Sequence, residues 1–155
     1  MLRNNDIYDK LIAGIQPPEG WELAIDIDPG NATQVKELEL LKKKVGLYLP
    51  FIAKRLEIFK YRAHRNYYIL IPESIIYIDR DGTFEVLFLV HKNDFRSPSM
   101  MGLKTDAADF LQELGEAEVR FRFAVAEDYN KFSLSRRHFM LRYSLKDLPS
   151  IRKAS

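Results

Sequence analysis

The sequence predicts an α+β fold, in which a mostly antiparallel sheet packs against two or three helices. Three observations support this class. The run SIIYIDRDGTFEVLFLV at 74–90 places Asp81-Gly82 between two β-branched and aromatic segments, which is typical of a β-hairpin. Other segments alternate apolar and polar residues, as half-buried strands do. Further segments repeat apolar residues every three or four positions, as amphipathic helices do.

The length and composition fit one globular domain, 1–155. A chain of 155 residues with 46% hydrophobic and 30% charged residues can bury an ordinary core. Cysteine is absent, which excludes disulfides, thiolate zinc sites and cysteine nucleophiles. No apolar run has the length of a bilayer span, and the N-terminus MLRNN does not open a secretory signal. We therefore expect a cytoplasmic protein without a membrane partner.

The first elements are read from spacing and turn residues. Apolar residues four apart predict a short helix at 5–15, and WELAIDI at 21–27 alternates as a strand. DPGN at 28–31 is a turn. Asn31 then caps a helix, with Gln34 reaching back to the cap.

The next segment carries two signals that end helices. Gly46 is a natural residue to stop the helix that begins after Asn31. Residues 47–65 fit either a helix with Pro50 in its first turn or a strand. We favour a helical turn at 50–53 and a strand from residue 55, and the choice decides whether the basic residues there form one stripe or two faces.

The last third of the chain predicts a loop, a helix and two strands. Residues 93–104 read as a long loop, and Thr105 and Gly115 would cap and end the helix that follows. AEVRFRFAVAE and SRRHFMLRYSL alternate as strands. Residues 149–155 form a flexible tail.

Two aspartates at the end of the first strand are candidate metal ligands. Asp26 and Asp28 are two residues apart, so on a continuous strand both would face the same side. Paired carboxylates suit Mg²⁺ or Mn²⁺ and the phosphoryl transfer that such metals assist. The alternative is structural, because an Asp before Pro-Gly is ordinary turn chemistry.

The stretch ELAIDID at 22–28 is similar to the aspartate-bearing strand of archaeo-eukaryotic primase-polymerases. That resemblance implies a helix and further strands after the pair, a histidine and a third carboxylate. His64 and Asp79 are the residues that would match. No other catalytic motif accompanies it: there is no glycine-rich phosphate loop and no nucleophile elbow. We therefore favour a protein that is not an enzyme and needs no cofactor, with Mg²⁺ or Mn²⁺ expected only if the aspartate pair is catalytic.

Basic residues are concentrated in two segments. Residues 34–65 carry nine basic and three acidic side chains, and residues 135–155 carry six and one. The stretch between them is acidic, with twelve acidic and seven basic side chains. The candidate nucleic-acid-binding residues, in segments 42–65 and 136–153, are Lys42, Lys43, Lys44, Lys54, Arg55, Lys60, Arg62, Arg65, Arg136, Arg137 and Arg142.

Three functions follow from these features. The first is a small non-catalytic binding module that contacts nucleic acid through the two basic segments, with aromatic residues between the cations stacking on bases. The second is a structural or adaptor subunit of a larger assembly, in which the charges pair within the fold, across a homo-oligomer or with a protein partner. The third is a metal-dependent phosphoryl or nucleotidyl transferase built on Asp26 and Asp28.

Overall fold

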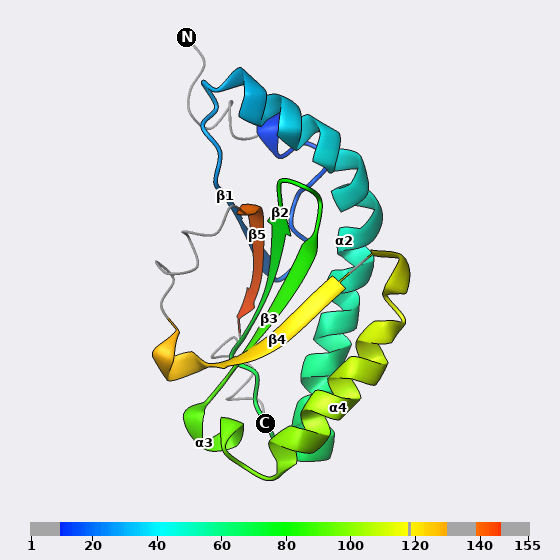
Figure 1. Ribbon diagram of the computed structural model, residues 1–155, viewed down its shortest axis with the longest axis vertical. Coiled ribbons are helices and arrows are strands. Elements are labelled where there is room, and N and C mark those ends of the chain that lie inside the picture. Colours follow the sequence, from blue (N-terminus) through cyan, green and yellow to red (C-terminus); the bar gives the residue numbers. More distant parts are fainter. Residues whose placement is uncertain (1–9, 118, 130–138, 147–155) are drawn as a thin grey trace.

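The computed structural model describes residues 10–117, 119–129 and 139–146 (Figure 1). Its elements are β1 (Trp21–Ile25), α2 (Ala32–Tyr67), β2 (Glu73–Asp79), β3 (Phe84–Val90), α3 (Lys92–Phe95), α4 (Ser99–Gln112), β4 (Val119–Val125) and β5 (Phe139–Lys146). Short 3-10 turns occupy Gly115–Ala117 and Ala126–Asp128. These elements form a single domain, and the predicted α+β class with a mostly antiparallel sheet is confirmed.

The five strands form one sheet in the order β1-β5-β2-β3-β4. Strand β5 is antiparallel to both of its neighbours, and β2 and β3 form the predicted antiparallel hairpin. Strand β4 is parallel to β3, and α3 and α4 make the crossover that a parallel pair requires. Strand β5, the last of the described strands in the sequence, therefore lies inside the sheet. Strands β1 and β4 are the edges of the sheet as described.

The hairpin turn uses the residues that the sequence indicated. The N–H of Gly82 donates to the carbonyl of Asp79 (2.9 Å), and the N–H of Thr83 donates to Asp81 Oδ1 (3.1 Å). Gly82 has φ of +85°, a conformation that side chains with a Cβ rarely adopt. The turn is therefore fixed by its local sequence.

Helices cover one face of the sheet. Figure 1 shows α2 curving along that face with α4 beside its C-terminal half. The core between these layers centres on Phe59, whose ring centroid lies 5.0 Å from Phe88, 5.7 Å from Phe110 and 6.4 Å from Phe123. Side chains alternate along a strand, so Ile75 belongs to a second, smaller cluster on the other face.

The prediction that α2 would stop at Gly46 and give way to a strand near residue 55 is wrong. One helix runs through both Gly46 and Pro50, and residues 54–62 are helical. Tertiary packing decides the outcome, because buried residues recur every three or four positions along its whole length. They are Leu38, Leu41, Val45, Leu49, Ile52, Ala53, Leu56, Phe59 and Ala63.

The predicted long loop at 93–104 is also wrong. Helix α3 and the first part of α4 occupy it, and Met100 and Leu103 are buried in the core. Thr105 is not a cap: it lies inside α4, and its hydroxyl donates to the Met101 carbonyl (3.0 Å). Helix α4 packs closely on α2 because Gly102 has no side chain, since a Cβ there would lie 2.9 Å from Tyr67 Cε1.

Two predictions fall partly or wholly beyond the described residues. In the expected helix at 5–15, Lys10 and Leu11 are helical, residues 12–14 form a turn, Ile15 has no regular structure and residues 5–9 are not described. The expected tail at 149–155 is not described at all. Among the helices that are described, none is both long and apolar enough to cross a bilayer.

Candidate functional site

Helix α2 has an outer face that carries large apolar side chains in water. Opposite its buried residues lie Leu40, Leu47, Phe51, Ile58 and Tyr61, with exposed fractions of 75%, 68%, 51%, 44% and 65%. These five residues are separated by steps of seven, four, seven and three. Such steps are close to whole turns of an α-helix, so the side chains form one row along the helix. We call this row the α2 outer face.

Cations alternate with the apolar residues of the α2 outer face. Lys36, Lys43, Lys54 and Arg65 are all exposed on this side of the helix. Within the described part of the chain, no hydrogen bond or ion pair engages Lys43, Lys54 or Arg65. The face is therefore both apolar and positively charged.

A pocket adjoins the middle of the α2 outer face. It has a volume of about 710 Å³ and lies between α2 and the turn that follows α4. Leu47, Tyr48 and Phe51 form one wall, and Gln112, Glu113, Leu114, Gly115 and Ala117 form the other. A neighbouring helix that lay along the face would pass over its opening.

Three predicted nucleic-acid-binding residues are engaged within the fold. Arg55 forms an ion pair with Glu113, and its guanidinium carbon lies 4.2 Å from the ring centroid of Phe110. Arg62 pairs with Asp106 at 3.0 Å, and its guanidinium carbon lies 5.6 Å from the centroid of the same ring. Lys42 pairs with Glu39 at 2.8 Å. These cations fasten α2 to α4 or to its own helix.

The remaining predicted residues do not form a common surface. Lys44 lies over the ring of Phe84 (5.7 Å to the centroid), and Lys60 is half-buried at the margin of the packed side. Arg142 is on β5, paired in register with Tyr77, on the sheet face that α2 does not cover. Arg136 and Arg137 are not among the described residues. Of the eleven candidates, the structure brings Lys43, Lys54 and Arg65 together on the α2 outer face.

The two aspartates lie where β1 ends and the turn before α2 begins. Strand β1 ends at Ile25, and both Asp26 and Asp28 are exposed. The Oδ1 of Asp28 accepts from the N–H of Gly30 (2.9 Å), and the carbonyl of Asp28 accepts from the N–H of Asn31 (2.9 Å). The structural interpretation therefore fits Asp28, which opens the turn, whereas the N–H of Asp26 still donates to the Met140 carbonyl of β5 (2.9 Å).

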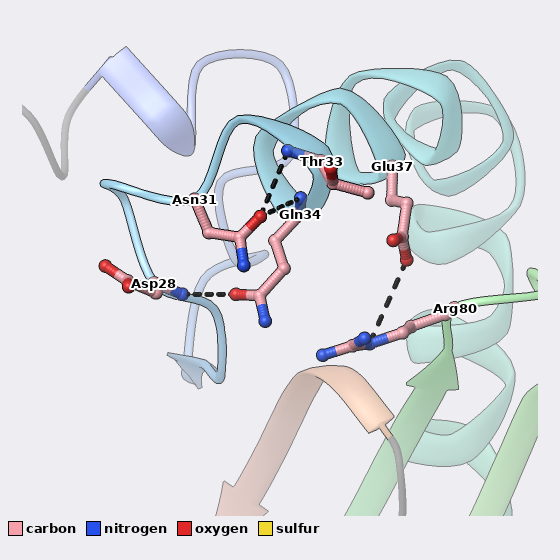
Figure 2. A network of polar contacts seen from close by, with 6 residues as sticks. All are labelled: Asp28, Asn31, Thr33, Gln34, Glu37 and Arg80. Atoms are coloured by element: carbon pink, nitrogen blue, oxygen red, sulfur yellow. Dashed lines mark hydrogen bonds and ion pairs between the residues drawn. The ribbon is translucent and has the colours of Figure 1, made fainter.

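The turn leads directly into α2, as Figure 2 shows. Asn31 Oδ1 accepts from the N–H groups of Thr33 (3.1 Å) and Gln34 (3.2 Å), which makes it the predicted N-cap. The Gln34 side chain reaches back past the cap to the N–H of Asp28 (2.6 Å). Beyond it, Glu37 approaches Arg80 at 3.9 Å, joining the helix start to the hairpin.

No third metal ligand accompanies the aspartate pair in the structure as described: these residues contain no group of three or more histidine or acidic side chains placed to hold an ion. Asp79, the residue that matched the third carboxylate, is in the hairpin on β2. The transferase function stays a prediction that this geometry does not favour.

The sheet face away from α2 carries a polar cluster that sequence reasoning did not identify. The hydroxyls of Tyr77 and Tyr129 are 2.6 Å apart, and Arg122 Nε lies 3.4 Å from Glu85 Oε1. Burial, with the hydrogen bond to Tyr129 next, raises the pKa of Tyr77 well above its ordinary value. The tyrosines therefore remain neutral and pack beside Leu87, so this cluster is part of the second core.

Sequence reasoning also missed the α2 outer face, although its signal is present. Two apolar rows run along α2 at helical spacing, and they are out of phase with each other. A helix with one apolar row buries it, whereas a second row on the opposite side indicates a second contact.

Comparison with protein-family models, with curated proteins and with solved structures found no match to this chain.

Proposed function

We propose that this protein is a non-catalytic binding module, a subunit of a larger protein assembly that it joins through the α2 outer face. The observation that carries the proposal is the row of five large apolar side chains exposed by 44–75% along one helix. Isolated exposed apolar residues are common, but a contiguous row rimmed by charge marks an interaction surface.

The physical argument rests on the hydrophobic free energy that the exposed apolar side chains of that face would gain on burial. Fully burying a Leu, Ile or Phe side chain is worth about 1.5–3 kcal/mol. While the face is in water, Leu47 forgoes most of this free energy, and Phe51 and Ile58 forgo about half of it. A partner that covers them recovers this free energy. A half-buried aromatic such as Phe51, beside a pocket, is the type of residue that dominates binding at interfaces.

Site-specific photo-crosslinking tests the proposal. A photoreactive phenylalanine at Leu47 is expected to give a discrete crosslinked product in cells that make the protein. The mass of the product also distinguishes a second copy of the 18.2 kDa chain from a different partner. The matched control carries the same group at Asp109, which is exposed on α4 away from this face. Equal yields from the two positions, or no product from Leu47, would contradict the proposal.

Nucleic acid is the second candidate partner, because Lys43, Lys54 and Arg65 lie on the same side of α2 as Tyr61, and Tyr68, which is 85% exposed, follows the end of the helix. Cations neutralise phosphates and exposed rings stack on unpaired bases. Anisotropy of labelled single-stranded and duplex oligonucleotides, titrated at about 50 and 200 mM salt, is then expected to show affinity that falls steeply with salt. Lys43→Glu with Lys54→Glu should abolish that binding, and Arg96→Glu, an exposed cation at the end of α3, should not. Absence of binding at the lower salt concentration would remove nucleic acid from consideration.

A further inference from the structure

We propose that the partner presents an acidic amphipathic helix that lies along the α2 outer face and inserts one large apolar side chain into the pocket beside Leu47 and Phe51. This inference rests on the proposed function, since it names the kind of partner that the same face accepts. It is argued from three features of the face: its repeat, its charge and its pocket.

The repeat of the face fits a helix. Positions on this side of α2 follow one another in alternating steps of four and three residues. They are Leu47, Phe51, Lys54, Ile58, Tyr61 and Arg65, and Leu40 precedes Leu47 by one heptad. Steps of four and three average 3.5 residues, the heptad spacing at which two helices stay in register along their length. The row therefore matches the seam of a helix pair and spans more than three heptads.

The charge of the face selects an acidic partner. Lys54 and Arg65 lie within the seam and Lys43 beside it, and none of them has a partner among the described residues. The nearby acids are already engaged: Glu39 pairs with Lys42, and Glu57 accepts from Trp21 Nε1 at 2.9 Å. In a second copy of this chain the same cations would face each other, which disfavours self-association through α2.

The order of the residues along the row disfavours two other anionic partners, a membrane surface and a nucleic acid. Helices that lie on membranes separate a continuous apolar side from a basic side. Here Lys54 interrupts the apolar row between Phe51 and Ile58. Leu40, Leu47 and Ile58 have no aromatic ring to stack on a base. A helix whose acidic and apolar side chains repeat at the same spacing matches the row position by position.

The pocket gives the partner a fixed register. Its second wall is open at Gly115, where an added Cβ would meet no atom within 4 Å. Glu113 on the same wall is paired with Arg55, so its charge does not repel an acidic partner strongly. A Leu, Phe or Trp side chain of the partner would fill this space and bury Leu47 and Phe51 at the same time.

Two synthetic peptides test this inference. Both are helical, about four heptads long, with leucine at the seam positions and one tryptophan among them. One has glutamate at the flanking positions and in place of the leucines that would face Lys54 and Arg65, and the other has lysine at the same places. Anisotropy of the labelled peptides is expected to show the glutamate peptide binding at least about tenfold more tightly, with the difference shrinking in high salt.

Two variants of the protein locate the contact. Gly115→Leu fills the pocket from its open side, and Lys54→Glu reverses the central charge. Each is expected to weaken the glutamate peptide about tenfold or more, whereas Arg96→Glu leaves it unchanged. Circular dichroism melting curves verify that each variant folds. If Gly115→Leu does not fold, Lys54→Glu still tests whether the positive charge of the α2 outer face selects an acidic helix.

The outcomes separate this inference from the proposed function. Equal affinity for the two peptides, or affinity that neither variant changes, overturns the acidic helix. Binding to anionic vesicles or oligonucleotides in place of both peptides overturns it as well. A crosslink from Leu47 in those cases leaves the docking function standing with a partner of different chemistry. Absence of the crosslink together with absence of peptide binding contradicts both the acidic helix and the proposed function.

Discussion

Replacing Phe59 with alanine is expected to lower the free energy of unfolding by about 3–5 kcal/mol. The Phe59 side chain is fully buried where α2, α4 and the sheet meet, among the rings of Phe88, Phe110 and Phe123. Its removal leaves a cavity that a helix and a sheet cannot both move to close. Urea denaturation followed by circular dichroism measures the change.

The adjacent residue provides the control. Ile58 is next to Phe59 in the same helix, but its side chain is 44% exposed on the α2 outer face. Ile58→Ala is expected to change the free energy of unfolding by less than about 1 kcal/mol. Comparable losses from the two variants would mean that α2 does not bury the side assigned here to the core.

Replacing Tyr143 with phenylalanine is expected to cost about 1–3 kcal/mol, although only one oxygen is removed. The Tyr143 hydroxyl donates to the carbonyl of Ile15 at 2.6 Å, and both residues are buried. Without the hydroxyl, the buried carbonyl of Ile15 loses this hydrogen-bond donor. The bond also holds the segment before β1 against β5.

Tyr61→Phe is the matched control for this hydroxyl, because Tyr61 is 65% exposed and its hydroxyl is available to water. We expect a change within about 0.5 kcal/mol for it, measured by the same denaturation experiment. If Tyr143→Phe changed the free energy of unfolding as little as Tyr61→Phe, the buried hydrogen bond to Ile15 would not contribute to stability.

The parts of the fold that depend on neighbouring residues were predictable. Asp81-Gly82 specified the hairpin, and Asn31 specified the start of α2, because turns and caps use contacts within a few residues. The end of α2 was not predictable in this way. Gly46 and Pro50 signal a stop locally, but the buried row from Leu38 to Ala63 outweighs them by packing on the sheet.

The candidate site was predictable only as a concentration of charge. The sequence indicated Arg55 and Arg62 as candidate nucleic-acid-binding residues, whereas their partners, Glu113 and Asp106, come from α4 and its C-cap, far along the chain. Pairing between distant segments has no local signal. The exposed apolar row did have a local signal, since its repeat can be read directly, but the row crosses Gly46 and residue 55, where the sequence predicted that the helix would end.

The position of β5 has a consequence for how the molecule is made. Among the described strands, β1 pairs with β5 alone, and β5 is the last of them to leave the ribosome. During synthesis the β2–β3 hairpin and α2 can associate, but residues 21–25 must wait for residues 139–146 before they have a ladder partner. Closing so long a loop is slow, so the nascent chain exposes an unpaired apolar strand until residues 139–146 have been synthesised. A chain truncated before residue 139 would lack β5 and leave β1 without its ladder partner. We expect cellular quality control to treat such a chain as misfolded.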